Sequence, residues 1–279
     1  MEVAGRNATA LAERNPLAVD ARIRFEEENH IYFVDGERFK GPSITKLLKE
    51  SFSGEEFNAR IIITRRLASW RANESNKYHR TVQGLTDEDA IEAVQALWTQ
   101  SNVLGTLLHR ALEMHFNDEP LPDDEIEDVL PEFRAAVRFF EKHPEYTPHH
   151  TELSLLYETP DGRVVAVGQA DLLAKKRTVG PDGTVVNSFA LIDFKRVIKS
   201  LDPNDRDWGQ NGINFMRGVR GNDYNKYSLQ QSLYAVMLEQ QGIKVSEMHL
   251  LKCHPGLKEA EFIQCADFRH EAKLILDAL

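Results

Sequence analysis

Two carboxylates and a lysine occupy segments whose residue pattern is typical of neighbouring β-strands. Asp171 ends the tetrapeptide Gly168-Gln-Ala-Asp171, and Asp193 and Lys195 belong to Leu191-Ile-Asp-Phe-Lys195. Side chains along a strand alternate between two faces, so Asp193 and Lys195 share one face. If the two segments pair in a sheet, Asp171 and Asp193 meet across the ladder.

Two carboxylates that face each other near apolar residues repel each other and lose hydration. A cation bound between them is the simplest way to offset both costs. Mg²⁺ or Mn²⁺ accepts oxygen ligands, keeps water molecules and lowers the pKa of a bound water so that it can attack phosphorus. Lys195 would orient or deprotonate that water, or neutralise charge on a phosphate. The alternative is that Asp171 only ends a strand and that Asp193 and Lys195 form a surface ion pair. The apolar run at 189–192 favours a buried site.

The segments that must position these residues lie in the second half of the chain. Alternating residues and two Pro-Asp-Gly turns predict an antiparallel meander. Its three strands are expected at 151–157, 163–174 and 184–194. An apolar stripe that includes Leu229 and Leu233 predicts a helix over 227–241. Two short strands, near 246–252 and 260–265, and a helix near 267–278 complete this half.

The first half of the chain is expected to be mainly helical. Residues 1–20 are interpreted as a flexible arm, and alternation around Asp35-Gly36 predicts a β-hairpin within 21–42. The helical region spans 43–145. Its helices are expected to begin after Ser43, to cover 55–80, to run from Asp87 through Trp98, and to cover about 102–117. We therefore predict one α/β domain over 21–279, with its core at 146–279.

The motifs at 168–171 and 192–195 resemble motifs II and III of the PD-(D/E)xK nucleases. Three further features resemble the RecB-like branch of that superfamily. The segment Gly105-Thr-Leu-Leu-His109 is similar to a G-x-x-x-H motif whose histidine binds metal. Glu152 falls where a glutamate often opens the strand before motif II, and 230–234 is similar to a Q-x-x-x-Y helix that contacts substrate. The branch includes RecB-type helicase-nuclease domains, CRISPR-adaptation nucleases and the mitochondrial genome maintenance exonuclease.

The resemblance implies a restriction-endonuclease-like core, with a mixed central sheet flanked by helices and a helical N-terminal elaboration. It also implies Mg²⁺- or Mn²⁺-dependent hydrolysis of DNA at single-stranded or duplex ends, in repair, recombination or replication. A structure-selective endonuclease and a non-catalytic DNA-binding subunit remain alternatives. The two cysteines cannot supply the four thiolates of the iron-sulfur cluster that many CRISPR-adaptation relatives carry.

The implied site divides into metal ligands, catalytic residues and substrate contacts. The expected ligands are His109, Asp171, Asp193 and the Phe194 carbonyl, the expected catalytic residues are Asp171, Asp193, Lys195 and Glu152, and the expected substrate contacts are Gln230, Tyr234 and Tyr227. A histidine among carboxylates makes Mn²⁺ at least as suitable as Mg²⁺. Without the resemblance, His109 could be a core histidine and Glu152 an exposed strand residue. Tyr227, Gln230 and Tyr234 could be one face of a helix that packs against the sheet.

Charge limits how the chain can bind DNA. The net charge is −10, so a phosphate-binding surface must be local. The clearest basic segment is 55–80, where Arg65 and Arg66 could follow phosphates and where Trp70 and Tyr78 could stack on bases. The alternative is a solvated helix face. Further expected contacts are Arg196, Lys199, Arg217, Arg220 and Lys226.

The sequence contains no apolar run of the ~20 residues that a membrane span requires, and no signal-peptide core. We therefore expect an intracellular protein without a membrane partner. The oligomeric state and the compartment stay open.

Overall fold

The computed structural model describes residues 9–53, 58–121, 126–205 and 210–279. The chain divides into two compact units, Met1–Ser53 with Leu108–Leu279, and Gly54–Leu107. This differs from the single domain predicted over 21–279, because the smaller unit has its own apolar core around Ile63 and Val94. Residues 1–8 of the predicted arm and 55–57 of the predicted helical segment lie outside the described residues.

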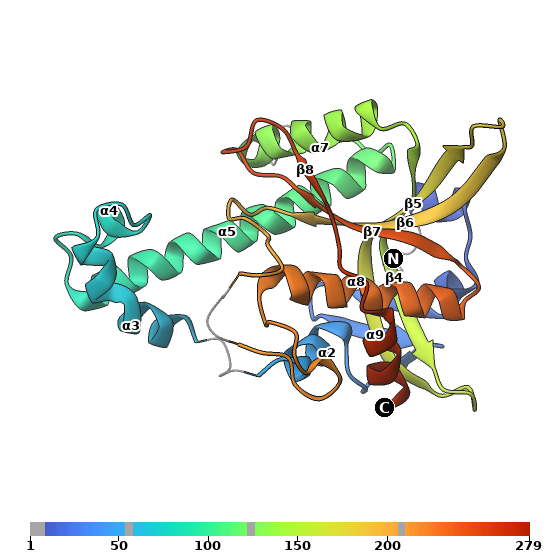
Figure 1. The fold of residues 1–279 in the computed structure, drawn as a ribbon, viewed down its shortest axis with the longest axis horizontal. Coiled ribbons are helices and arrows are strands. Elements are labelled where there is room, and N and C mark those ends of the chain that lie inside the picture. Colours follow the sequence, from blue (N-terminus) through green and yellow to red (C-terminus); the bar gives the residue numbers. More distant parts are fainter. Residues whose placement is uncertain (1–8, 54–57, 122–125, 206–209) are drawn as a thin grey trace. The chain divides into compact units, whose positions relative to one another are not determined.

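The larger unit is built on a five-stranded sheet in the order β4-β5-β6-β7-β8. Its strands are β4 (Tyr146–Glu158), β5 (Val164–Val179), β6 (Val185–Lys195), β7 (Val245–Lys252) and β8 (Glu261–Gln264). β6 and β7 are parallel, whereas the other neighbours are antiparallel. Helices α8 (Asp223–Gln240) and α7 (Leu130–Lys142) lie on opposite sides of the sheet (Figure 1). The predicted meander and the predicted α/β class, a mixed sheet flanked by helices as in a restriction-endonuclease-like core, are confirmed.

A second, smaller antiparallel sheet confirms the predicted hairpin. It contains β1 (Ile23–Glu26), β2 (Ile31–Val34) and β3 (Glu37–Arg38). The positive φ values of Asp35 and Gly36 form the tight turn between β2 and β3. The remaining helices of the described residues are α1 (Ala10–Arg14), α2 (Ile44–Ser51), α3 (Ala59–Ala72), α4 (His79–Val82), α5 (Asp87–Phe116) and α9 (Arg269–Asp277), with short 3₁₀ turns at η1 (Ala18–Ala21), η2 (Glu127–Val129) and η3 (Asn214–Met216).

Two N-terminal predictions are wrong. The described part of the predicted flexible arm, 9–20, is packed, because Leu11 and Val19 are buried and the Leu11 amide donates to Asn117 Oδ1 at 2.9 Å. α5 is one continuous helix instead of two, because the polar stretch at 99–102 is exposed and contains no proline that would end it. Among the described residues, no helix has the length and apolar character needed to cross a membrane.

The glycine at the start of the Gly168-Gln-Ala-Asp171 motif allows two helices to approach β5 closely. A Cβ atom at Gly168 would lie 2.6 Å from Ile44 Cγ1 on α2 and 2.7 Å from Tyr234 Cε1 on α8. Both distances are too short for carbon atoms, so any larger residue forces the side chain of Ile44 or Tyr234 to move. The glycine therefore serves the packing that surrounds the candidate site.

We predict that Gly168→Ala lowers the free energy of unfolding by about 1–3 kcal/mol, the usual cost of overpacking a core. Urea denaturation measures this change. Gly105→Ala is the matched control, because a Cβ there meets nothing within 4 Å and alanine in a helix stabilises by about 0.5–1 kcal/mol. Equal stability of Gly168→Ala and the wild type would contradict the packing role.

Candidate active site

Three side chains from three elements converge beside the end of β6. His109 comes from α5, Glu152 from β4 and Asp171 from β5, and one ligand atom from each lies within 4.8 Å of the other two. Nδ1 of His109 is 3.4 Å from Asp171 Oδ2 and 3.8 Å from Glu152 Oε1. All three side chains are half-buried. The structure thus brings together residues that are far apart in the sequence and that were predicted to share one site.

Glu152 and Asp171 face each other because of the strand register. Thr151 pairs with Leu172 and Leu153 pairs with Ala170, which places Glu152 opposite Asp171. Glu152 has a φ of 46°, a left-handed conformation that a glutamate rarely adopts. Such strain persists only where the surrounding structure imposes it, and it is frequent at functional sites. No local sequence signal marks this conformation.

The Phe194 main chain connects two of the converging residues. Its carbonyl accepts a hydrogen bond from His109 Nε2 at 2.9 Å, and its amide donates to Asp171 Oδ2 at 2.9 Å. A carbonyl can only accept, so Nε2 carries a proton and Nδ1 is left facing the carboxylates. Phe194 was predicted as an oxygen ligand. That ligand role stays a prediction, and the structure adds that the Phe194 main chain orients His109 and Asp171, a role that the sequence did not indicate.

Electrostatics give His109 a positive charge in this arrangement. Burial lowers the pKa of His109, but the charge of Asp171 and the Glu152 carboxylate outweigh this effect and raise the pKa to about 9. The imidazolium therefore balances two carboxylates at neutral pH. A divalent cation bound by Nδ1 would replace one proton, which is the usual coupling between metal binding and protonation.

Asp193 and Lys195 form a buried ion pair next to this group. Asp193 is 1% exposed, and its Oδ2 lies 2.6 Å from Lys195 Nζ. Burial raises the pKa of Asp193, and the neighbouring charge of Asp171 adds to the increase. Burial lowers the pKa of Lys195, but Asp193 and Asp171 more than compensate and raise it. Lys195 is therefore held as a cation.

The predicted alignment of Asp171 with Asp193 agrees with the register of β5 and β6. Leu172 pairs with Ile192, so the next positions along the two strands are Asp171 and Asp193. Asp193 is nevertheless not one of the three residues whose ligand atoms converge within 4.8 Å. Its carboxylate points toward Lys195 instead.

The donor set fits a Mg²⁺ or Mn²⁺ ion. One imidazole nitrogen and two carboxylates converge, and both oxygens of the buried Asp193 lack a well-directed hydrogen bond. Carboxylates are typical ligands of both ions, and the imidazole suits Mn²⁺ in particular. A cation would also compensate the cost of burying the Asp193 charge, which Lys195 alone offsets in part.

The three residues predicted to contact substrate lie on α8 but have different surroundings. The Lys195 ammonium lies 4.5 Å from the centre of the Tyr227 ring. Gln230 Nε2 donates to the Tyr234 hydroxyl at 3.3 Å. Tyr234 is 3% exposed and packs against Gly168, so it supports the core, whereas Tyr227 and Gln230 are half-buried.

Arg196 was predicted to contact DNA, but the structure places it in a buried ion pair. Its Nε lies 2.7 Å from Oε1 of Glu132 on α7, and Glu132 is 1% exposed. A buried carboxylate without a partner would be strongly destabilising. Arg196 therefore ties α7 to the end of β6.

The basic segment at 55–80 belongs to the smaller unit. Arg65 and Arg66 are exposed on α3. Trp70 is 6% exposed, and its ring centre lies 4.5 Å from that of Tyr78, whose hydroxyl accepts from Trp98 Nε1 at 2.7 Å. The prediction that Trp70 stacks on bases is therefore wrong. The i, i+4, i+7 spacing of Ile63, Leu67 and Trp70 is the signal that would have identified a core stripe.

Tyr32 of β2 is a neighbour of the site that the sequence did not reveal. Burial raises the pKa of Tyr32, and the negative charge of Glu152 adds to this increase. Its phenol therefore stays neutral at physiological pH. No spacing connects residue 32 with the motifs of the second half, so only the fold could show this proximity.

No protein-family model and no curated protein matches the chain. Among solved structures, a protein from Eubacterium rectale named "Putative exonuclease" aligns with 81% of this chain and 84% of its own, at 12% identity and a TM-score of 0.36. SSO0001 aligns with 84% of this chain and 81% of its own, at 17% identity and a TM-score of 0.29. At these TM-scores neither neighbour contributes to a functional argument, and the RecB-like branch stays a prediction.

The convergence of His109, Glu152 and Asp171 predicts a measurable metal affinity. We expect Mn²⁺ to stabilise the wild type against urea and to stabilise neither Glu152→Gln nor Glu152→Gly, because both variants lose one ligand. Without metal, Glu152→Gly should be more stable than Glu152→Gln by about 1 kcal/mol, because only glycine relieves the left-handed strain. Undiminished Mn²⁺ stabilisation of both variants would exclude Glu152 as a ligand.

Proposed function

We propose that this protein is a Mg²⁺- or Mn²⁺-dependent deoxyribonuclease that hydrolyses phosphodiester bonds at single-stranded or duplex DNA ends. One observation carries the proposal. His109, Glu152 and Asp171 converge within 4.8 Å, and the buried Asp193–Lys195 ion pair lies on the neighbouring strand. A cation-binding cluster beside a fixed ammonium group is what hydrolysis of an anionic ester requires.

The cation ligands are held by the fold before any metal binds. A bound Mg²⁺ or Mn²⁺ supplies a Lewis acid and a water molecule of lowered pKa. Asp171 and Glu152 would hold the ion from adjacent strands, with His109 as the nitrogen ligand. The Phe194 main chain keeps His109 and Asp171 in orientation through its two hydrogen bonds. Asp193, whose oxygens lack well-directed hydrogen bonds, is the fourth expected ligand.

Lys195 acts as a cation in this proposal. Asp193 and Asp171 raise its pKa, so a neutral amine that could remove a proton is rare at neutral pH. The ammonium is suited to orient the attacking water and to neutralise charge that develops on the phosphate. Of the roles expected for Lys195, these two agree best with its surroundings.

The substrate strand would contact the half-buried side chains of α8 next to Lys195. Gln230 offers an amide that can hydrogen-bond to the DNA, and Tyr227 flanks the ammonium. Arg65 and Arg66, which are exposed on α3, are proposed to bind phosphates. The salt dependence of DNA binding follows the number of phosphates that cations neutralise, so with a few local cations we expect binding to weaken only moderately as salt rises.

End-labelled single- and double-stranded DNA in Mg²⁺, Mn²⁺ or EDTA tests the activity. We expect the wild type to release nucleotides with either metal and to be inactive in EDTA. Asp193→Asn and Lys195→Met should each lower kcat roughly 100-fold or more, because each removes a charge from the reaction centre. Lys273→Met, which removes an exposed lysine on α9, is the matched control. Undiminished metal-dependent cleavage by the two site variants would refute the assignment.

A comparison of linear and circular single-stranded DNA of the same sequence separates an exonuclease from its alternatives. We expect linear DNA to be degraded and circular DNA to resist, because the proposed reaction starts at an end. Equal rates on both substrates would indicate an endonuclease. Tight DNA binding without cleavage in either metal would indicate a non-catalytic DNA-binding subunit.

A further inference from the structure

The Lys195 ammonium contacts both a carboxylate and an aromatic ring. Asp193 Oδ2 is 2.6 Å from Nζ, and the centre of the Tyr227 ring is 4.5 Å from the same atom. A cation is attracted to the face of an aromatic ring by the negative charge density there, most strongly where water is excluded. Only 16% of the Lys195 side chain is exposed. Two different interactions therefore hold one ammonium group.

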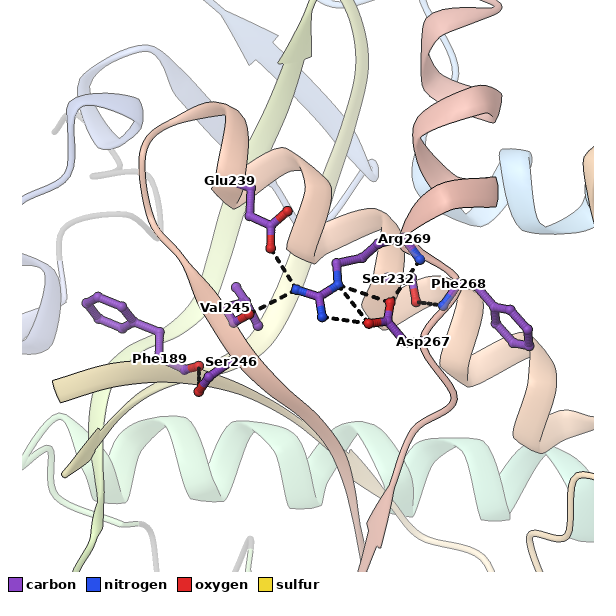
Figure 2. Close-up of polar contacts among 8 residues, drawn as sticks. All are labelled: Phe189, Ser232, Glu239, Val245, Ser246, Asp267, Phe268 and Arg269. Atoms are coloured by element: carbon purple, nitrogen blue, oxygen red, sulfur yellow. Dashed lines mark hydrogen bonds and ion pairs between the residues drawn. The ribbon is translucent and has the colours of Figure 1, made fainter. Parts of the chain in front are cut away.

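The Tyr227 ring is held in place because α8 is anchored along its length. The Asn222 side chain caps the helix by accepting from the Asn225 amide at 2.9 Å. Farther along, Ser232 Oγ accepts from the Phe268 amide at 3.0 Å, and Arg269 binds Glu239 at 2.8 Å (Figure 2). These contacts connect α8 with the segment that leads into α9. The helix cannot shift along the sheet without breaking them, so the fold determines the position of the ring.

The neighbours of Tyr227 on the same helix face have other roles. Gln230 donates to the Tyr234 hydroxyl, and Tyr234 is buried against Gly168. Tyr227 is the member of this face whose ring meets Lys195. Its contact with the ammonium is made by the ring, so the hydroxyl is not needed for it.

We infer that Tyr227 is a positioning residue, whose ring face holds the Lys195 ammonium at one place beside the cation-binding cluster. A lysine side chain is long and flexible. With Asp193 alone, Nζ could move around either carboxylate oxygen and still keep its ion pair. The contact with the ring face restricts this movement. The catalytic consequence of this role rests on the proposed nuclease function, whereas the contact itself does not.

Two substitutions of Tyr227 test the inference in the full-length protein, because one removes the aromatic ring and keeps an apolar side chain, and the other keeps the ring. In the Mn²⁺-dependent assay on single-stranded DNA, Tyr227→Leu should lower kcat about tenfold with little change in KM, because it removes the cation–π contact. Tyr227→Phe should recover most of this loss, since it keeps the ring and lacks only the hydroxyl. In a Lys195→Met background, Tyr227→Leu should have no further effect. A Tyr227→Phe variant as slow as Tyr227→Leu, or full additivity with Lys195→Met, would overturn the inference.

A second measurement does not depend on activity. In NMR spectra of the protein without metal, the Lys195 ε-methylene protons should resonate upfield of other lysines because of the ring current of Tyr227. Lys195→Met identifies the signal by its loss. The shift should persist in Tyr227→Phe and disappear in Tyr227→Leu, with thermal unfolding confirming that both variants fold. An unshifted wild-type signal would overturn the positioning role. An upfield shift in a protein without nuclease activity would support the contact and refute the proposed function.

Discussion

The structure depends on positive side chains that balance the negative charge of carboxylates converging in a partly dehydrated site. Glu152 faces Asp171 across two strands, and the buried Asp193 follows on the next strand. Such an arrangement is unfavourable unless positive charge is close. His109 and Lys195 supply that charge at 3.4 Å and 2.6 Å from the carboxylates of Asp171 and Asp193. In the proposed function, a divalent cation would replace the proton on Nδ1 and take over part of this balance.

Several structural details serve this balance. β4 contains Glu152 in a left-handed conformation, and the Phe194 main chain is hydrogen-bonded to both His109 and Asp171. Gly168 allows α2 and α8 to approach the sheet, and α8 brings Tyr227 to Lys195. The buried pair of Arg196 and Glu132 secures α7 immediately after β6. Together these contacts hold the charged side chains in one geometry.

The strands could be predicted from sequence because they depend on local periodicity, whereas the convergence of His109 and Glu152 with Asp171 was expected from the resemblance to the PD-(D/E)xK nucleases. The alternation of apolar and polar residues predicted the three-stranded meander. The two-residue period of side chains along a strand placed Asp193 and Lys195 on one face. Other features depend on contacts between distant segments. The φ of Glu152, the Tyr32 neighbour and the pairing of Arg196 with Glu132 have no local signal. The burial of Trp70, in contrast, has a local signal. Its helical spacing with Ile63 and Leu67 indicates a core position, and its aromatic ring alone does not indicate base stacking. This small core belongs to the separate unit at Gly54–Leu107.

Anomalous diffraction from a crystal soaked in Mn²⁺ tests the central claim most directly, because it locates the ion without reference to activity. We predict an anomalous peak within bonding distance of His109 Nδ1 and of the Asp171 and Glu152 carboxylates, and its loss in Asp171→Asn crystals. A well-occupied Mn²⁺ peak elsewhere, with none between these three residues, would contradict the account.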